Sequence, residues 1–108
     1  IRRNLMAWSP AVFIGFNSIR FDEEMLRNAL FQCLYPPYLT SYHRNCRADA
    51  LSLMMAADAV SPAQLVVPIN DEGRRTFRLQ HLAAANGVAH PRAHDAMSDV
   101  LATVELCR

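Results

Sequence analysis

Two segments of the sequence place acidic residues where a buried strand or a tight turn is predicted to lead into a helix. The first is Phe21-Asp22-Glu23-Glu24, and the second is His94-Asp95-Ala96-Met97-Ser98-Asp99. Carboxylates bind hard cations, and an imidazole can carry a proton near neutral pH. The same acids could instead cap the helices, because Asp22 and Asp95 are favoured N-cap residues and each such cap contributes about 1 kcal/mol. Taken one at a time, capping is the simpler interpretation.

The elements that must position these residues are predicted from the hydrophobic pattern. Residues 1–7 are typical of a helix end, because the residue before the proline in Ser9-Pro10 is disfavoured in a helix. Residues 11–16 form a short, continuously apolar run, which predicts a strand buried on both faces of a sheet. From Asp22 the apolar residues recur at helical spacing to Cys33, and Pro36-Pro37 should end that helix.

Three further helices are predicted. The first runs from about residue 47 to 60, and an irregular or hairpin-like excursion follows over 62–76. A short helix covers 77–85, with Asn86-Gly87 as its C-terminal stop. The last helix follows Asp95, and its residues at i, i+3, i+4 and i+7 make one apolar face. These residues are Met97, Val100, Leu101 and Val104. We expect one compact unit with one buried strand and about four helices.

The composition is that of a globular protein. Of the 108 residues, 52% are hydrophobic and 19% are charged, and the formal net charge is +1. This charge does not mark a nucleic-acid binder, so any nucleic-acid site must be local. The 3 cysteines contain no CxxC pair, which argues against a disulfide framework and fits a reducing cytoplasm. No apolar stretch reaches the roughly 20 residues of a membrane span, so we expect no membrane partner.

Three blocks of the sequence resemble a known superfamily. Residues 15–24 (GFNSIRFDEE) and 93–100 (AHDAMSDV) resemble the second and third motifs of the 3′-to-5′ exonucleases with four acidic residues and a histidine. This superfamily is the DEDDh type of the ribonuclease-H-like fold. The FRLQHL block at 77–82 is similar to a bacterial member that removes nucleotides from the 3′ end of single-stranded DNA. The H-x4-D spacing alone is a weak signal, but the three blocks together are specific, and the resemblance runs from about Phe13 to Cys107.

The resemblance implies an α/β domain with the ribonuclease-H-like exonuclease fold and hydrolysis of phosphodiesters with two metal ions. By similarity, Asp22 and Asp99 are two of the four acids that bind two Mg²⁺ ions, or Mn²⁺ in their place. His94 would be the general base that deprotonates the attacking water, since an imidazole suits that role near neutral pH. Asp95 remains an N-cap and is not counted as a ligand.

The other two acids of the superfamily form an Asp-x-Glu pair on the first strand of the sheet, and no such pair can be assigned in this sequence. We therefore expect residues 1–108 to be the C-terminal part of an exonuclease domain whose N-terminal strands precede Ile1. The second metal site would then be incomplete. These residues alone are expected to bind Mg²⁺ weakly and to have little or no activity.

Basic residues could hold a DNA strand through its phosphates. Arg74, Arg75 and Arg78 form the densest basic cluster, and phosphate contacts fix a strand in register without reading its sequence. Solvated surface arginines are the alternative. The residues predicted to contact nucleic acid are Arg78, Asn17, Arg20 and Arg74. By resemblance the partner is single-stranded DNA, with a single-stranded-DNA-binding protein as a further partner through domains outside these residues.

The function implied by the resemblance is an exonuclease that releases 5′-mononucleotides from single-stranded DNA in repair or recombination. A proofreading or RNA-trimming exonuclease of the same superfamily is one alternative. The other alternative is a non-catalytic nucleic-acid-binding or interaction module with the same fold, in which the Asp-x-Glu pair has been lost. An Asp-x-Glu pair on a buried strand upstream of these residues would favour the enzyme.

Overall fold

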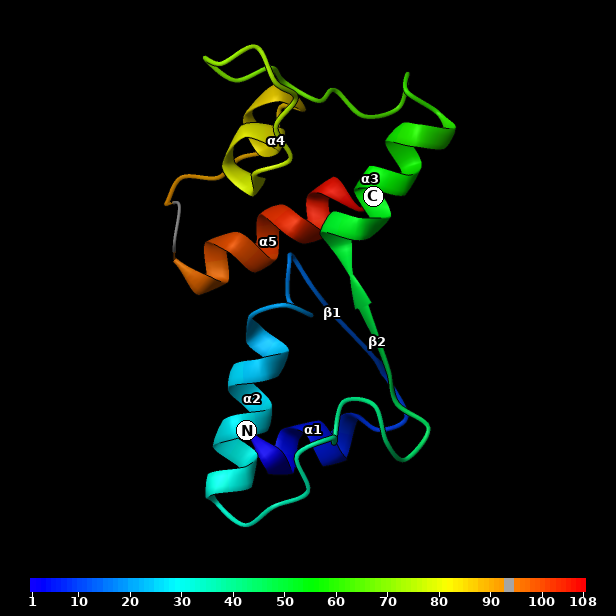
Figure 1. Ribbon diagram of the computed structural model, residues 1–108, viewed down its shortest axis with the longest axis vertical. Coiled ribbons are helices and arrows are strands. Elements are labelled where there is room, and N and C mark those ends of the chain that lie inside the picture. Colours follow the sequence, from blue (N-terminus) through cyan, green and yellow to red (C-terminus); the bar gives the residue numbers. More distant parts are fainter. Residues whose placement is uncertain (93–94) are drawn as a thin grey trace. The chain divides into compact units, whose positions relative to one another are not determined.

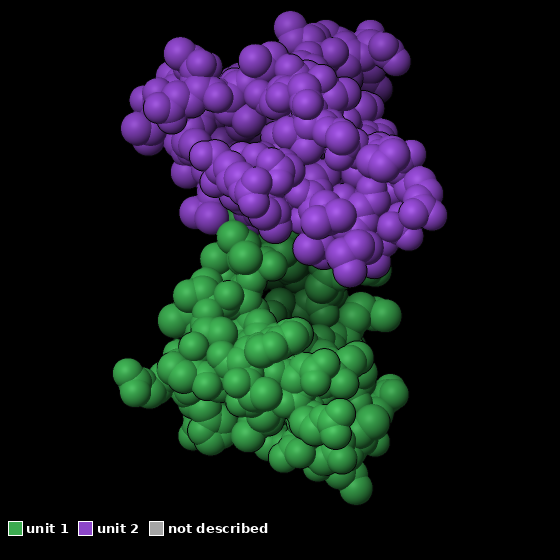
Figure 2. Space-filling model, turned by 180° about the vertical axis from the view of Figure 1, so that it is seen from behind, with its two compact units in different colours: residues 1–49 green, residues 50–108 purple. Residues whose placement is uncertain are grey.

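A computed structural model of the chain describes residues 1–92 and 95–108. The chain divides into two compact units, residues 1–49 and residues 50–108, whereas the sequence predicted one unit (Figure 2). Each unit buries apolar side chains of its own, such as Leu5 and Leu30 in the first and Met54 and Leu82 in the second.

The first unit is a strand-helix-strand arrangement preceded by a short helix. Strands β1 and β2 are parallel and pair in the register Val12↔Cys46 to Gly15↔Asp49. Parallel strands need a crossover connection, and α2 lies in that connection (Figure 1). The elements are α1 (Arg2–Trp8), β1 (Val12–Gly15), α2 (Asp22–Gln32) and β2 (Cys46–Asp49).

Strand β2 is absent from the sequence-based prediction, which assigned residues from about 47 onward to a helix. The strand has the sequence CRAD, and Cys46 and Arg47 are exposed, so no apolar alternation marks it. Its strand conformation follows from backbone pairing with β1. The prediction for β1 was correct in position and wrong in burial, because Val12 is 64% exposed and Ile14 is 51% exposed. Alternate side chains of a strand point to opposite faces, so one face of β1 is open.

The second unit contains three helices, α3 (Ala50–Val60), α4 (Leu79–Ala85) and α5 (Ala96–Leu106). Helices α4 and α5 contact each other, and Leu82, Ala83 and Ala102 are fully buried (Figure 1). The helix predicted after Asp95 is confirmed, but its predicted apolar face is exposed. Its buried residues are Ser98, Ala102 and Thr103, and such small side chains allow a neighbouring helix to approach closely.

The segment between α3 and α4 is the irregular excursion that the sequence predicted. It contains one isolated antiparallel bridge between Ile69 and Arg75. Helix α4 ends where Asn86-Gly87 predicted, because Gly87 has φ +70° and Val88 donates its N–H to the carbonyl oxygen of Ala83 at 2.8 Å. The fold class is α/β, as predicted, with a second strand that the sequence did not indicate. Across residues 1–92 and 95–108, none of the helices has the length and apolarity of a transmembrane segment.

Candidate active site

The first acidic segment begins at a tight turn between β1 and α2. Gly15 ends β1, and a Cβ atom at this position would lie 2.8 Å from the Cβ of Ser18. Asn17 has φ +55°, in the left-handed region that Asn tolerates better than most residues. The Ser18 carbonyl oxygen accepts the N–H of Glu23 at 2.9 Å, which joins the turn to the first turn of α2. This geometry explains the types of Gly15 and Asn17 in the GFN motif.

Asp49, at the end of β2, accepts hydrogen bonds from the backbone of this turn. Its Oδ1 accepts the backbone N–H of Asn17 at 2.8 Å, and its Oδ2 accepts that of Ile19 at 3.2 Å. The residue is buried, with 7% of its surface exposed. The sequence did not identify Asp49 as part of the site, because its partners are 32 and 30 residues away and the strand that places it has no local signal.

Asp22 is the first residue of α2, and its side chain lies at the exposed start of the helix. The N-cap position belongs to Phe21, which makes no side-chain cap hydrogen bond, so the alternative interpretation of Asp22 as an N-cap is wrong. The carboxylate lies in the first turn, near the positive end of the helix dipole. Asp22 therefore remains available to a ligand.

The neighbouring acid Glu23 has a structural role. It is buried, and its Oε2 accepts the hydroxyl of Thr40 at 2.7 Å and lies 3.5 Å from the guanidinium of Arg47. Buried charges need such partners to offset their loss of water. Glu23 thus ties α2 to the segment before β2 and to β2 itself.

The second acidic segment contains the cap that the sequence predicted. Asp95 is the N-cap of α5, and its Oδ2 accepts the backbone N–H of Ser98 at 3.1 Å. His94, the predicted general base, lies outside the described residues. Asp99 lies in the first turn of α5, where its carboxylate is close to the positive end of the helix dipole.

Asp99 contacts a histidine that the sequence did not assign to the site. The Nε2 of His90 lies 2.6 Å from Oδ1 of Asp99, and the two side chains are 7% and 37% exposed. An ionised carboxylate only accepts hydrogen bonds, so Nε2 carries the proton in this contact. The one sequence feature that could have indicated His90 is its position four residues before His94.

The residues implied as metal ligands fit a divalent cation in kind but not in number. Asp22 and Asp99 offer the carboxylate oxygens that Mg²⁺ prefers. However, Asp22 belongs to the first unit and Asp99 to the second. In residues 1–92 and 95–108 there is no group of three or more His, Cys, Asp or Glu side chains that could hold a metal ion. Asp22 and Asp99 are thus the two implied carboxylate ligands that the structure describes.

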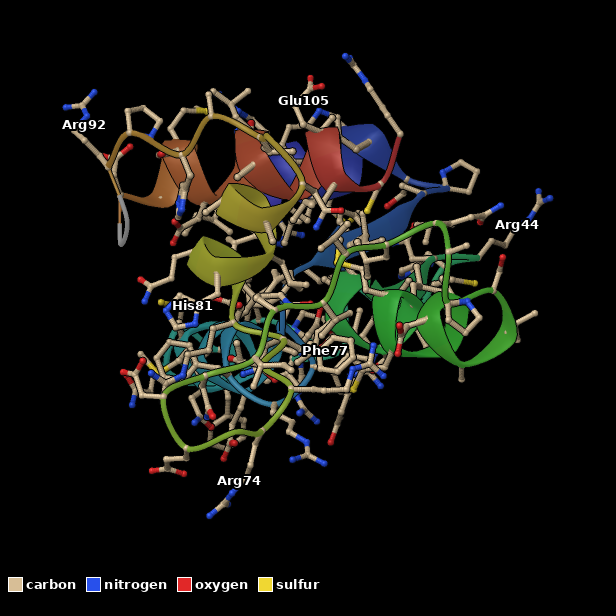
Figure 3. The ribbon with its side chains drawn as sticks, turned by 90° about the horizontal axis from the view of Figure 1, so that it is seen from above. Arg44, Arg74, Phe77, His81, Arg92 and Glu105 are labelled. Atoms are coloured by element: carbon tan, nitrogen blue, oxygen red, sulfur yellow. The ribbon has the colours of Figure 1, made fainter. Side chains whose placement is uncertain are left out.

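The arginines of the basic cluster differ in their partners. Arg75 donates to Asp58 at 2.6 Å, and this hydrogen bond raises the pKa of Arg75 against the opposing effect of desolvation. Asp58 is buried, so this pair anchors the excursion to α3. Arg74 points away from the chain and lies 3.4 Å from Glu72, in an exposed pair of the kind that contributes little stability (Figure 3).

The other residues predicted to contact nucleic acid are exposed. Arg78 is the N-cap residue of α4, so its exposed side chain lies at the start of that helix. Asn17 and Arg20 lie on the turn that leads to Asp22. The second unit also has a pocket of about 500 Å³ between the excursion and α4, but its lining contains none of the predicted site residues. His81, which is labelled in Figure 3, is part of that lining.

Comparison with known proteins tests the resemblance that the motifs indicate. No model of a protein family matches the chain. Exodeoxyribonuclease I of Escherichia coli is 45% identical over 96 residues, which are 88% of this chain and 20% of that protein. A crystal structure of Escherichia coli exonuclease I in complex with a dT13 oligonucleotide has a TM-score of 0.88 and 39% identity, covering 98% of this chain and 24% of that one. The chain is homologous to a part of exodeoxyribonuclease I.

The predicted resemblance to exodeoxyribonuclease I is thus confirmed in sequence and in fold. A structure of an ExoI/SSB-Ct complex is also similar, with a TM-score of 0.83 and 38% identity over 97% of this chain and 23% of that one. The chain spans 20–24% of the length of exodeoxyribonuclease I in these matches.

Proposed function

We propose that this chain contributes to a 3′-to-5′ exonuclease that hydrolyses single-stranded DNA to 5′-mononucleotides in repair or recombination. The observation that carries the proposal is the match over nearly the whole chain to exonuclease I bound to a dT13 oligonucleotide. An identity of 45% to exodeoxyribonuclease I supports it independently of the structure. The cytoplasm is the proposed location.

The proposed site consists of Asp22 and Asp99 as ligands of divalent cations and His94 as the general base. Two Mg²⁺ ions, or Mn²⁺, would activate water and neutralise charge on the phosphate and the leaving oxygen. The exposure of Asp22 at the start of α2 supports its proposed role as a ligand. The hydrogen bond between Asp99 and His90 supports the same role for Asp99, because ligating carboxylates are themselves held by hydrogen bonds.

The DNA strand is proposed to contact Arg78, Asn17, Arg20 and Arg74. Arg78 is the strongest candidate, because it is exposed at the start of α4 and belongs to the FRLQHL block. Arg74 already has Glu72 as a partner, so its contact with phosphate would compete with that pair. A single-stranded-DNA-binding protein is proposed as a further partner through parts of the protein outside these residues.

We also propose that the chain is the C-terminal part of the exonuclease domain, with the Asp-x-Glu pair supplied by a segment outside residues 1–108. It rests on the resemblance, because the sequence contains no Asp-x-Glu pair that can be assigned to the first strand of the sheet. Incubation of the isolated chain with Mg²⁺ and single-stranded DNA should yield little or no product. Strong Mg²⁺-dependent degradation by the isolated chain would contradict the proposal.

A chimera tests the function directly. In this protein, hereafter the chimera, the present chain replaces the segment of Escherichia coli exodeoxyribonuclease I that it matches. The proposal predicts Mg²⁺-dependent shortening of 5′-labelled single-stranded DNA from its 3′ end, with mononucleotides as products. A chimera that folds, as judged by circular dichroism and cooperative unfolding, but degrades no DNA would overturn the proposal.

The same assay separates the alternatives. Faster degradation of RNA, or of mismatched primer ends, than of single-stranded DNA would favour an RNA-trimming or a proofreading exonuclease. Binding of single-stranded DNA by a folded chimera without degradation would favour a non-catalytic module.

A further inference from the structure

The contact between Asp49 and the turn after β1 is a feature that the proposed function does not use. The carboxylate of Asp49 is buried, and both of its oxygens accept backbone N–H groups of the turn, from Asn17 at 2.8 Å and from Ile19 at 3.2 Å. Hydrogen bonds from backbone N–H groups to a charged acceptor are among the stronger ones in proteins. Both bonds run from the end of β2 to the turn after β1, which lies nearby because Asp49 pairs with Gly15 in the sheet.

The turn that Asp49 holds has a narrowly defined path. The backbone at Gly15 lies so close to Ser18 that a Cβ atom at Gly15 would be 2.8 Å from the Cβ of Ser18. Asn17 adopts φ +55°. Residues in this region of backbone space persist when their surroundings stabilise them. The N–H of Asn17, which is the residue in that conformation, is one of the two groups bound by Asp49. The hydrogen bonds of Asp49 therefore stabilise the strained part of the turn.

The position of this turn also determines where α2 begins. The Ser18 carbonyl oxygen accepts N–H groups of Phe21 at 3.3 Å and of Glu23 at 2.9 Å, on either side of Asp22. A shift of the turn therefore moves the first residue of the helix with it. Asp22 is exposed on the first turn of α2, so the position of its carboxylate follows that of the backbone.

We propose that Asp49 is a positioning residue for Asp22: through the N–H groups of Asn17 and Ile19 it fixes the turn that places the Asp22 carboxylate for cation binding. This inference rests on the proposed function, because it presumes that Asp22 binds a cation. Asp49 is not a ligand itself, since its two oxygens face the turn's N–H groups. A mutation far from the reacting atoms that misplaces a catalytic group by about 1 Å can lower a rate about 100-fold, so such a positioning role affects activity strongly.

Asp49→Asn is the informative variant because it preserves the size of the side chain. An amide has one oxygen and one NH₂ group, so it can accept only one of the two N–H groups and faces the other with a donor. In the 108-residue chain, amide hydrogen exchange should quicken at Asn17 or Ile19 and stay unchanged in the ladder between β1 and β2. Unchanged exchange at both amides would overturn the structural part of the inference.

The functional part is tested in the chimera by titration with Mg²⁺. Asp49→Asn should lower kcat by about 10- to 100-fold, the range for residues that orient ligands, and should raise the Mg²⁺ concentration needed for half-maximal rate. The KM for DNA should change little. Asp49→Glu keeps the carboxylate and should therefore recover part of the loss in kcat. If Asp49→Asn fails to fold, kcat and Mg²⁺ dependence are compared between Asp49→Glu and the parent chimera.

Asp58→Asn is the matched control, because Asp58 is also buried and holds Arg75 in the other unit. It should lower thermal stability and leave the Mg²⁺ dependence unchanged. If Asp49→Asn exchanges faster at Asn17 or Ile19 but keeps the kcat and Mg²⁺ dependence of the parent chimera, the inference is wrong and the proposed function stands. Inactivity of the parent chimera would instead overturn the proposed function.

Discussion

The two junctions that carry the proposed ligands are built in different ways. The turn before Asp22 is held through its backbone by Asp49, a residue 32 positions after Asn17 in the chain. The junction around Asp99 is held by nearby residues, with Asp95 capping Ser98 three positions later and His90 contacting Asp99 nine positions later. The first arrangement places the start of a helix, and the second places a carboxylate directly.

This difference separates the effects that substitutions should have. A change near Asp22 acts by shifting the turn, so its effect on activity should accompany an effect on local hydrogen bonding. A change near Asp99 acts on the carboxylate itself, so activity should fall while the backbone stays in place. The same loss of activity thus has two distinguishable physical causes.

The largest effect is expected for Asp99→Asn in the chimera. The amide has the shape of the carboxylate but lacks its charge, so Mg²⁺-dependent activity should fall to the background of a nucleotide-release assay. The free energy of unfolding in urea should fall only slightly, by about 0.3–1 kcal/mol, because the variant loses a charge near the positive end of the helix dipole.

Asp95→Ala is the matched control on the same helix. It removes the bond to Ser98 and should lower the free energy of unfolding by about 1 kcal/mol, with activity retained under folding conditions. If Asp99→Asn were as active as the parent chimera, Asp99 would not be a ligand.

A smaller loss is expected for His90→Ala. The buried imidazole donates to Asp99, and removal of a group that orients a ligand lowers metal affinity or activity by about 10- to 100-fold. Nucleotide release at a series of Mg²⁺ concentrations measures both. His81→Ala, on α4, serves as the histidine control and should leave both quantities near those of the parent. Equal effects of the two variants would show that the contact with Asp99 has no special role.

The turn before Asp22 is tested by Gly15→Ala. The added Cβ would lie 2.8 Å from the Cβ of Ser18, so the turn must move. Overpacking of this kind costs about 1–3 kcal/mol, which urea unfolding of the chimera would detect together with a lower rate. The double variant Gly15→Ala with Ser18→Gly removes the clash and should recover most of both losses. A Gly15→Ala variant with unchanged stability and rate would refute the account of the turn.

The smallest effect is expected at the exposed arginines. Arg78→Ala should weaken binding of single-stranded DNA to the chimera and reduce the slope of log K against log salt by about 0.7, the contribution of one phosphate contact. Arg20→Ala tests the turn of the first unit in the same way. Fluorescence anisotropy at several salt concentrations measures both slopes. If both variants bind single-stranded DNA more weakly but keep the slope of log K against log salt, these side chains do not contact phosphates.

The sequence predicted the parts of the fold that have a local signal. The cap at Asp95 and the stop at Gly87 are examples, because each depends on a few consecutive residues. Strand β2 was missed, because it is short and polar and exists through pairing with β1. Asp49 was missed for the same reason, since only that pairing brings it to the turn.

The candidate site was predicted from motif resemblance more than from periodicity. Helical patterns placed Asp22 and Asp99 in first turns, where acids are common for structural reasons. His90 could have been noticed from its spacing to His94, but nothing in the sequence states that it contacts Asp99 rather than solvent. The contact depends on where the segment that follows α4 places His90 relative to the first turn of α5.

The role of Asp22 as a cation ligand is tested most directly by comparing Asp22→Ala with Glu24→Ala in the chimera. Both are acids in the first turn of α2, and both are exposed, so they differ mainly in the role proposed for Asp22. The measurement is Mg²⁺-dependent release of nucleotides from the 3′ end of single-stranded DNA. We expect background activity for Asp22→Ala and activity close to that of the parent chimera for Glu24→Ala. Undiminished activity of Asp22→Ala would contradict the assignment of Asp22 as a ligand.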